Sequence, residues 1–140
     1  MKTEYLDDEI EERDGLFYQF GSDVPFTGTF QDYWNNGDLK GVYQIKNGKL
    51  HGELKIYWDN GQLSFYQKCE NGIPNGHNYG YWKDGKEWFS LYFRNGEREG
   101  VSELFRADGT LETRCYYKDG ELDGVHETFA EDGTLEKKVF

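Results

Sequence analysis

The chain has few of the residues that mark secreted, membrane-spanning or nucleic-acid-binding proteins. Its 140 residues include 2 cysteines, 2 prolines and 1 methionine, and no apolar run approaches the roughly 18 residues of a membrane span. Lysine and arginine total 16 against 27 acidic residues, which gives a net charge of −11. Because nucleic acids and anionic lipids are bound by clustered cations, we expect neither as a partner. The acidic first residues also lack the basic start and apolar run of a signal peptide, so we expect a cytoplasmic protein.

The spacings of metal-binding and catalytic residues are also absent from the sequence. Cys69 and Cys115 form no CxxC pair, and the three histidines have no ligand spacing, so we expect no metal and no cofactor. No HExxH, GxSxG, P-loop or dinucleotide-binding pattern occurs. Glu53, Glu103 and Glu127 have an ordinary interpretation as cross-strand partners of lysine or arginine. We therefore expect a protein without catalytic residues.

Glycine, by contrast, is abundant and regularly spaced. Fourteen of the 18 glycines lie in three columns, each of which recurs at every twenty-fourth position. The columns are Gly48, Gly72, Gly96 and Gly120; Gly28, Gly52, Gly76, Gly100 and Gly124; and Gly37, Gly61, Gly85, Gly109 and Gly133. A fixed period of this length is typical of a repeat array, in which neighbouring units cover each other's apolar surface. A half unit at residues 14–20 precedes five further units, so the array has about five and a half repeats.

Each unit carries two turn signals separated by runs of strand length. Asn36-Gly37 and its equivalents pair Asn or Asp with Gly, which predicts two-residue hairpin turns because both positions then take positive φ. The second connection, Asn47 to Gly52 and its equivalents, has two glycines four apart and predicts a longer polar turn. Residues 15–140 show no sustained helical period. The prediction is an all-β fold: an elongated, twisted antiparallel β-meander of about eleven strands, built of 24-residue β-hairpin repeats.

Alternation along the predicted strands assigns the side chains to two faces. Leu, Tyr, Ile, Phe and Cys residues of the second strand in each unit share one face, exemplified by Leu39, Tyr43 and Ile45 and by Leu63, Phe65 and Cys69. An aromatic that recurs five residues after a column glycine is assigned to the same apolar layer: Tyr33, Tyr57, Tyr81, Phe105 and Phe129. Cys69 and Cys115 lie four strands apart, about 19 Å. That separation excludes a disulfide unless the sheet closes on itself.

Aromatic residues that differ between units are candidates for a binding face, because interface hot spots favour Trp and Tyr. The residue after the recurrent aromatic is Trp in three units and then Arg106 and Ala130. We expect these tryptophans, with one further Trp and three Tyr, opposite the Leu and Phe columns. Packing of this face by curling of the sheet or by the N-terminal segment is the alternative. The candidates are Trp34, Trp58, Trp82, Trp88, Tyr66, Tyr92 and Tyr116.

The negative charge is concentrated at the N-terminus, where residues 1–14 hold seven acidic and two basic side chains. We divide the chain into an acidic N-terminal segment, residues 1–13, and a repeat domain, residues 14–140. Tyr5, Leu6 and Ile10 would form a narrow apolar stripe on a short helix, which is marginal in isolation. The segment is either a solvated or loosely docked tail or an acidic contact arm for a basic partner. Its contact candidates are Asp7, Asp8, Glu9, Glu11 and Glu12.

The unit pattern Asn/Asp-Gly-x-x-x-Gly, then an aromatic, then Asn/Asp-Gly-x-Leu, resembles the MORN repeat (membrane occupation and recognition nexus). It resembles more closely the bacterial variant of YwqK-like antitoxin or immunity proteins, over residues 14–140. Asp14–Tyr18 followed by Val24–Gly28 is similar to the opening of many such proteins. Pro74, Glu87 in the Leu column and the acidic extension depart from the pattern. The resemblance implies an elongated hairpin array that binds another protein and has no catalytic residues.

Two classes of function fit these observations. The first is an antitoxin or immunity protein that neutralises a basic toxin encoded nearby by direct binding, with complementary charge speeding association. The alternative is a general MORN-type scaffold or adaptor without a toxin partner, including a membrane-associated one, although the net charge of −11 disfavours anionic lipid. A meander has a free edge at each end, and Lys137 and Lys138 protect the last strand against pairing. We therefore expect a monomer or a weak dimer.

Overall fold

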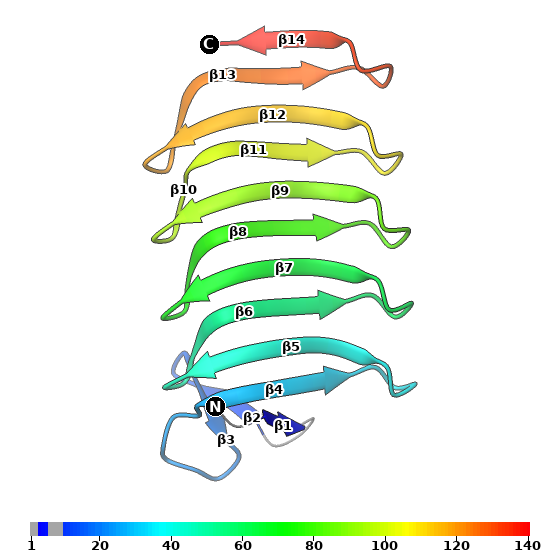
Figure 1. Ribbon diagram of the computed structural model, residues 1–140. Helices are drawn as coiled ribbons and strands as arrows, with labels where there is room; N and C mark the ends of the chain where they lie inside the picture. The colour runs from blue at the N-terminus through cyan, green and yellow to red at the C-terminus, as the bar shows by residue number, and fades with distance from the viewer. Residues whose placement is uncertain (1–2, 6–9) are drawn as a thin grey trace.

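A computed structural model describes residues 3–5 and 10–140, and every regular element in these ranges is a β-strand (Figure 1). The described residues contain no helix that could cross a membrane. The helix expected around Tyr5 and Ile10 is wrong, because both residues lie in strands. The strands are Thr3–Tyr5 (β1), Ile10–Arg13 (β2), Leu16–Gln19 (β3), Gly28–Tyr33 (β4), Leu39–Lys46 (β5), Lys49–Tyr57 (β6), Leu63–Glu70 (β7), Ile73–Tyr81 (β8), Glu87–Arg94 (β9), Glu97–Arg98 (β10), Gly100–Phe105 (β11), Leu111–Lys118 (β12), Glu121–Phe129 (β13) and Leu135–Val139 (β14).

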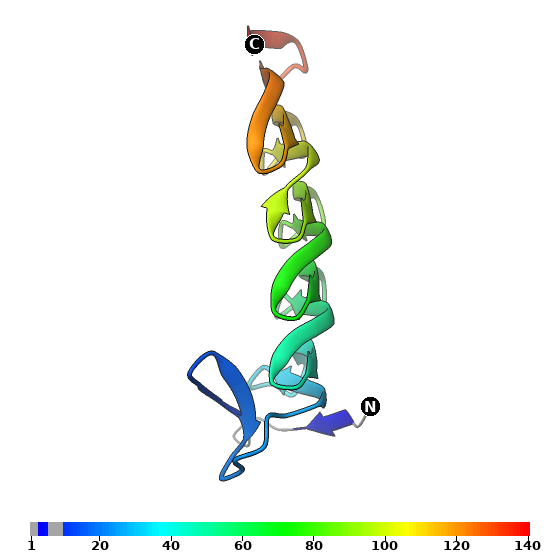
Figure 2. The ribbon, with the colours of Figure 1, turned by 90° about the vertical axis from the view of Figure 1, so that its left-hand side faces the viewer.

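The predicted meander is confirmed. From β4 to β14 the strands follow one another antiparallel in a single open sheet, with the short β10 paired to β9 and β1 added parallel to β4. Figures 1 and 2 show the result, a tall and narrow column of curved strands that rises from β4 to β14. Because the sheet is open, Cys69 on β7 and Cys115 on β12 stay apart, and both are free thiols.

The half unit expected at residues 14–20 does not continue this sheet. β2 and β3 pair with each other through a turn at Asp14-Gly15 and form a separate hairpin, so that part of the prediction is wrong. Figure 2 shows this hairpin projecting beside the base of the column. The Phe17 N–H donates to the Gly48 carbonyl, and the Phe26 N–H donates to the Phe17 carbonyl. The hairpin therefore docks on the first complete unit, and the boundary placed between residues 13 and 14 falls at its turn.

The lengths of the two turns in each unit are the reverse of those predicted, so this part of the prediction is wrong. Asn47-Gly48 is the two-residue turn: Lys46 pairs directly with Lys49, and φ is 50° at Asn47 and 80° at Gly48. Asn36-Gly37 instead lies within a longer loop, residues 34–38, where Gly37 has a φ of 91° and Asn36 is not in the positive-φ region. The Asn36 Oδ1 accepts a 2.9 Å hydrogen bond from the Asp38 N–H. A side-chain acceptor of this kind stabilises the longer loop without positive φ at Asn.

Bulges next to these loops decide which face each side chain occupies. The pairing shifts by one residue between Ile56 and Tyr57, so that Tyr57 pairs with Leu63 after Ile56 has paired with Phe65. An extra residue in one strand bends that strand and moves the side chains beyond it to the opposite face of the sheet. Tyr57 and Leu63 consequently line a hollow with Tyr66, on the side opposite Ile56 and Phe65.

The pairing register defines two faces, which we call the apolar face and the tyrosine face. The apolar face includes Phe30, Tyr43, Ile45, Leu54, Ile56, Phe65, Cys69, Phe89, Leu91, Phe93, Leu104 and Cys115. The tyrosine face includes Glu53, Lys55, Tyr66, His77, Tyr79, Ser90, Tyr92, Glu103 and Arg114. The predicted layer is confirmed for Tyr43, Ile45, Phe65 and Cys69. It is wrong for Leu39 and Leu63, which the bulges move to the opposite face. The placement of the recurrent aromatics in that layer is wrong, since Tyr81 packs edge-on to Tyr79 at 5.7 Å.

The buried core lies at the base of the column. Ile45 is 0% exposed and Phe26 is 8% exposed. The half-buried apolar side chains around them come from the first unit, from Leu50 at the start of the second unit and from the β2–β3 hairpin. Ile10 and Phe17 are the hairpin's contribution. The hairpin therefore covers the apolar face of the first unit, in the way that a second layer covers a sheet.

Hydrogen bonds from each tight turn to the preceding unit also hold consecutive units together. The glycine N–H of the turn donates to a carbonyl at the start of the preceding unit's first strand, as Gly72 does to Leu50 and Gly96 to Pro74. The neighbouring Asn or Asp N–H donates to a side chain of the same preceding strand, as Asn71 does to His51 Nδ1 at 3.2 Å. Consecutive units are thus joined at their turns as well as along their strands.

A test of the exchanged turns compares two asparagines. Asn71, with a φ of 51°, is in a tight turn, whereas Asn35 is in a longer loop and outside the positive-φ region. Asn71→Val should lower the free energy of unfolding by about 1–2 kcal/mol, because a β-branched residue is strained at positive φ. Asn35→Val is the matched control and should change it by less than about 0.5 kcal/mol. Urea unfolding followed by circular dichroism measures both, and equal effects would contradict the turn assignment.

Candidate functional site

Tryptophan side chains connect consecutive loops along one edge of the sheet. The Trp58 Nε1 donates a 3.0 Å hydrogen bond to the Tyr81 carbonyl, and the Trp82 Nε1 donates a 3.1 Å bond to the Arg106 carbonyl. Arg106 takes the tryptophan position in the next unit, and its Nη2 donates to the Phe129 carbonyl at 2.5 Å. Arginine therefore replaces tryptophan in the same connecting role, which gives these half-buried side chains a structural function.

The aromatic row predicted as one surface is divided between the two faces. The Trp82 ring stacks on Trp88 at 4.9 Å, and Trp88 lies edge-on to Phe89 at 5.2 Å. The placement of Trp88 opposite the Leu and Phe columns is wrong, because the bulge at Trp88 turns it to the side of Phe89. Tyr66, Tyr92 and Tyr116 lie on the tyrosine face, as predicted.

Trp34 differs from the other two tryptophans of its column. Its Nε1 is buried and has no hydrogen-bond partner within residues 3–5 and 10–140. The Lys40 Nζ lies 4.9 Å from the centre of the Trp34 ring, within the range of a cation–π interaction.

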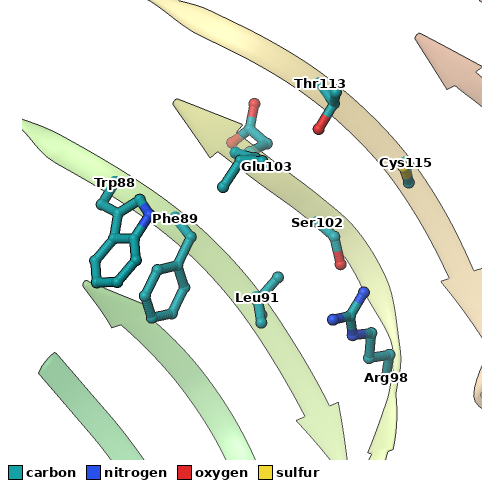
Figure 3. Close-up of a pocket in the computed structure, with 9 residues that line it drawn as sticks. Trp88, Phe89, Leu91, Arg98, Ser102, Glu103, Thr113 and Cys115 are labelled. Atoms are coloured by element: carbon teal, nitrogen blue, oxygen red, sulfur yellow. The ribbon is translucent and has the colours of Figure 1, made fainter. Parts of the chain in front are cut away.

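Beyond the first unit the apolar face lies open and contains a hollow of about 360 Å³. Figure 3 shows Trp88, Phe89 and Leu91 along β9 on one side of it, and Ser102 and Cys115 on the following strands. Leu104, at its border, is 38% exposed, and the Ser102 Oγ is buried without a partner among the described residues. The lining residues are Trp88, Phe89, Leu91, Arg98, Ser102, Glu103, Leu104, Thr113 and Cys115.

The thiol in this hollow is not an activated nucleophile. Burial raises the pKa of Cys115, and the nearby charge of Arg98 opposes this shift only in part. A thiol whose pKa is raised stays protonated near neutral pH, whereas the thiolate is the reactive form. The hollow is therefore suited to holding apolar groups rather than to attacking a substrate.

The tyrosine face carries a continuous cluster of aromatic rings. Tyr66 stacks on Tyr79 at 4.7 Å, and Tyr81 packs edge-on to Tyr79 at 5.7 Å. His77 meets both Tyr79 and Tyr92 edge-on, at 6.1 and 5.5 Å. Rings held by one another in this way present a rigid, amphipathic surface, which suits protein recognition.

Carboxylates border this cluster. The Tyr66 hydroxyl donates a 2.6 Å hydrogen bond to the Glu53 Oε2, and this bond, followed by burial, raises the pKa of Tyr66 to about 12. The Arg114 Nε donates to the Glu103 Oε2 at 3.1 Å. Glu127 lies opposite Arg114 in the sheet. The expectation that these glutamates are cross-strand partners of lysine or arginine is confirmed for Glu103. Glu53 instead bonds across the strands to Tyr66, and its ion pair is with Lys55 on the same strand.

The acidic N-terminal candidates are described only in part. Asp7, Asp8 and Glu9 lie outside the described residues. Glu11, on β2, is half-buried and forms a 3.1 Å ion pair with Arg13, whereas Glu12 is exposed and carries no ion pair between described residues.

No group of three or more His, Cys, Asp or Glu side chains could hold a metal ion in the described part of the chain. His51 accepts a backbone hydrogen bond in the stack, and His77 is part of the ring cluster.

Part of the chain matches the model of a known protein family. The model of a MORN repeat variant matches residues 50–67, which cover most of β6, the following loop and part of β7. No curated protein matches the chain. The match supports the resemblance to MORN repeats and indicates a repeat-containing binding scaffold.

The sequence analysis did not identify His77, Tyr79 and Tyr81 as part of one surface. Their alternate positions along β8 are the signal that could have placed them on the same face.

The connecting role of Trp82 is tested by two substitutions. Trp82→Ala removes the indole hydrogen bond and the contact with Trp88, and should lower the free energy of unfolding by about 2–3 kcal/mol. Trp82→Phe keeps a ring but loses the donor, and should cost about 1 kcal/mol. Urea unfolding measures both; unfolding midpoints equal to that of the unmodified protein would show that Trp82 does not hold the stack together.

The Tyr66–Glu53 hydrogen bond predicts a pH dependence. Because the pKa of Tyr66 in the folded protein is about 12 against an ordinary 10.0, the folded state holds its proton more tightly than the unfolded state. The resulting stabilisation is present below pH 10 and decreases as the pH rises from 10 to 12. Ultraviolet tyrosinate absorbance should show a titration near pH 12 that disappears in Tyr66→Phe and moves to lower pH in Glu53→Gln. An unchanged titration in Glu53→Gln would contradict the assignment.

Proposed function

We propose that this chain is a non-enzymatic protein-binding scaffold of the antitoxin or immunity type, which neutralises a basic toxin by direct contact. The observation that carries the proposal is the open apolar face. In the first unit this face is covered by the chain's own hairpin through Ile10 and Phe17, whereas around Leu91 and Leu104 no described residue covers it. An apolar surface of this kind favours a protein partner.

The charge of the chain supports a basic partner. A net charge of −11 on a 140-residue chain creates a field that attracts basic proteins and speeds their association. Lys and Arg side chains on the partner would meet carboxylates at the border of the apolar face and along the loops. Basic surfaces are typical of proteins that act on nucleic acids, which is a common activity of toxins.

The rigidity of the column supports inhibition rather than transient contact. Backbone pairing along the strands, the turn hydrogen bonds and the tryptophan links preorganise the surface, so that binding orders few additional groups. A preorganised surface binds with a smaller entropic cost and releases its partner slowly.

Co-expression with the products of the adjacent genes tests the proposal. A basic product that arrests growth alone, is tolerated together with this chain and purifies with it as a complex would support the antitoxin function. Adjacent products that are not toxic, or that form no complex, would overturn it. Flotation of the chain with vesicles containing anionic lipid would instead favour the membrane-associated adaptor.

The contribution of the apolar face is tested by a matched pair of substitutions on β11. Leu104 lies on the apolar face and is 38% exposed, and Val101 lies on the tyrosine face and is 43% exposed. Leu104→Gln should weaken the complex about tenfold, because a polar group replaces an apolar contact. Val101→Gln should change the dissociation constant by less than about threefold. Calorimetry measures both variants after circular dichroism has confirmed their fold, and equal effects would show that the partner does not use the apolar face.

A further inference from the structure

One row of directly opposed side chains crosses the tyrosine face from strand to strand. Its members are Lys55, Tyr66, Tyr79, Ser90, Glu103, Arg114, Glu127 and Lys138. The last four alternate between acid and base, an order in which a carboxylate has a cation as its neighbour across the strands. Such opposite-charge neighbours stabilise a sheet face.

Ser90 interrupts this order. It lies directly opposite Glu103 on one side and Tyr79 on the other, at the place where alternation would put a cation. A serine side chain is too short to fill that place, and a hollow of about 270 Å³ remains there. The side chains that border it include His77, Tyr79, Tyr81, Glu87, Ser90 and Glu103.

The next unit shows how a cation fits at the equivalent position. Arg114 on β12 occupies the place that Ser90 occupies on β9, and its Nε donates to the Glu103 Oε2 at 3.1 Å. Its guanidinium carbon lies 5.7 Å from the centre of the Phe129 ring. In that unit the guanidinium group therefore has both a carboxylate and an aromatic ring as neighbours.

The hollow at Ser90 offers the same two kinds of neighbour without an occupant from the described chain. Tyr79 and Tyr81 supply rings, and Glu87 and Glu103 supply carboxylates. Glu103 is shared with Arg114, and the exposed Glu87 has no ion pair with any described side chain. The nearby Lys55 lies 4.0 Å from Glu53, on the far side of Tyr66 in the row.

We propose that the hollow at Ser90 binds an arginine side chain of the partner protein, between the tyrosine rings and the carboxylates of Glu87 and Glu103. The planar guanidinium group suits this site, because it stacks on rings and donates to carboxylates at the same time. The inference rests on the proposed function for the source of the arginine. The tyrosine rings, Glu87 and Ser90 belong to this hollow alone, whereas Glu103 and Phe89 also line the hollow of the open apolar face.

The experiment uses a single cation as probe, since a polycationic peptide would bind any protein of this charge. Acetyl-arginine amide is titrated into the ¹⁵N-labelled full chain, with acetyl-citrulline amide as the neutral analogue of the same shape. Arginine should shift the amide signals around Tyr79, Tyr81 and Ser90 with saturation in the millimolar range, and citrulline should not. Glu87→Gln should weaken binding about fivefold through loss of one carboxylate. Ser90→Arg should abolish it, because the introduced side chain occupies the hollow.

Glu131→Gln is the matched control, because it changes the net charge by the same amount at an exposed loop position. It should leave binding of the probe unchanged. Equal shifts with citrulline, equal weakening in Glu131→Gln, or binding that persists in a folded Ser90→Arg variant would overturn the inference. The outcome is independent of the proposed function, since the probe binds or fails to bind whether or not a toxin partner exists.

Discussion

Lateral pairing between consecutive units is the interaction on which the rest of this structure depends. Phe26, Ile45 and Cys69 are the only buried hydrophobic side chains in the described chain, so a conventional core exists only at its base. Elsewhere each unit is held by strand pairing along its length, by turn hydrogen bonds at one edge and by Trp or Arg links at the other. Stability of this kind is nearly one-dimensional, since each unit contacts its neighbours alone.

A single layer leaves both faces of the sheet available, and the two faces differ in chemistry. The apolar face, covered by the hairpin at the first unit, offers aromatic and aliphatic contacts around Leu91 and Leu104. The tyrosine face offers rings and carboxylates, with a hollow at Ser90 in an otherwise alternating row. A partner that wraps the column edge would contact both, and the acidity of the chain favours a basic one.

Most of the architecture could be predicted from the glycine period and the alternation of side chains. The prediction exchanged the two turns because Asn-Gly or Asp-Gly occurs in both connections, and local sequence does not show which Asn takes positive φ. It also misplaced Trp88, because the one-residue bulge on β9 reverses the alternation and leaves no distinct signal in a single sequence. Tyr81 was assigned to the apolar layer although it alternates in step with Tyr79 along β8. The prediction was least accurate for the binding surfaces, because the predicted aromatic row combined residues that the bulge places on opposite faces of the sheet.

The sequence by itself determined the repeat, the strand content and the antiparallel order, because these follow from the glycine period, the turn chemistry and the hydrophobic pattern within each unit. Tertiary structure alone decided which side chains meet. Residues such as Trp58 and Tyr81, or Ser90 and Glu103, become neighbours only when one unit is stacked on the next in a definite register. Register depends on bulges and on hydrogen bonds between distant residues, so the surfaces of this protein exist only in the stacked chain.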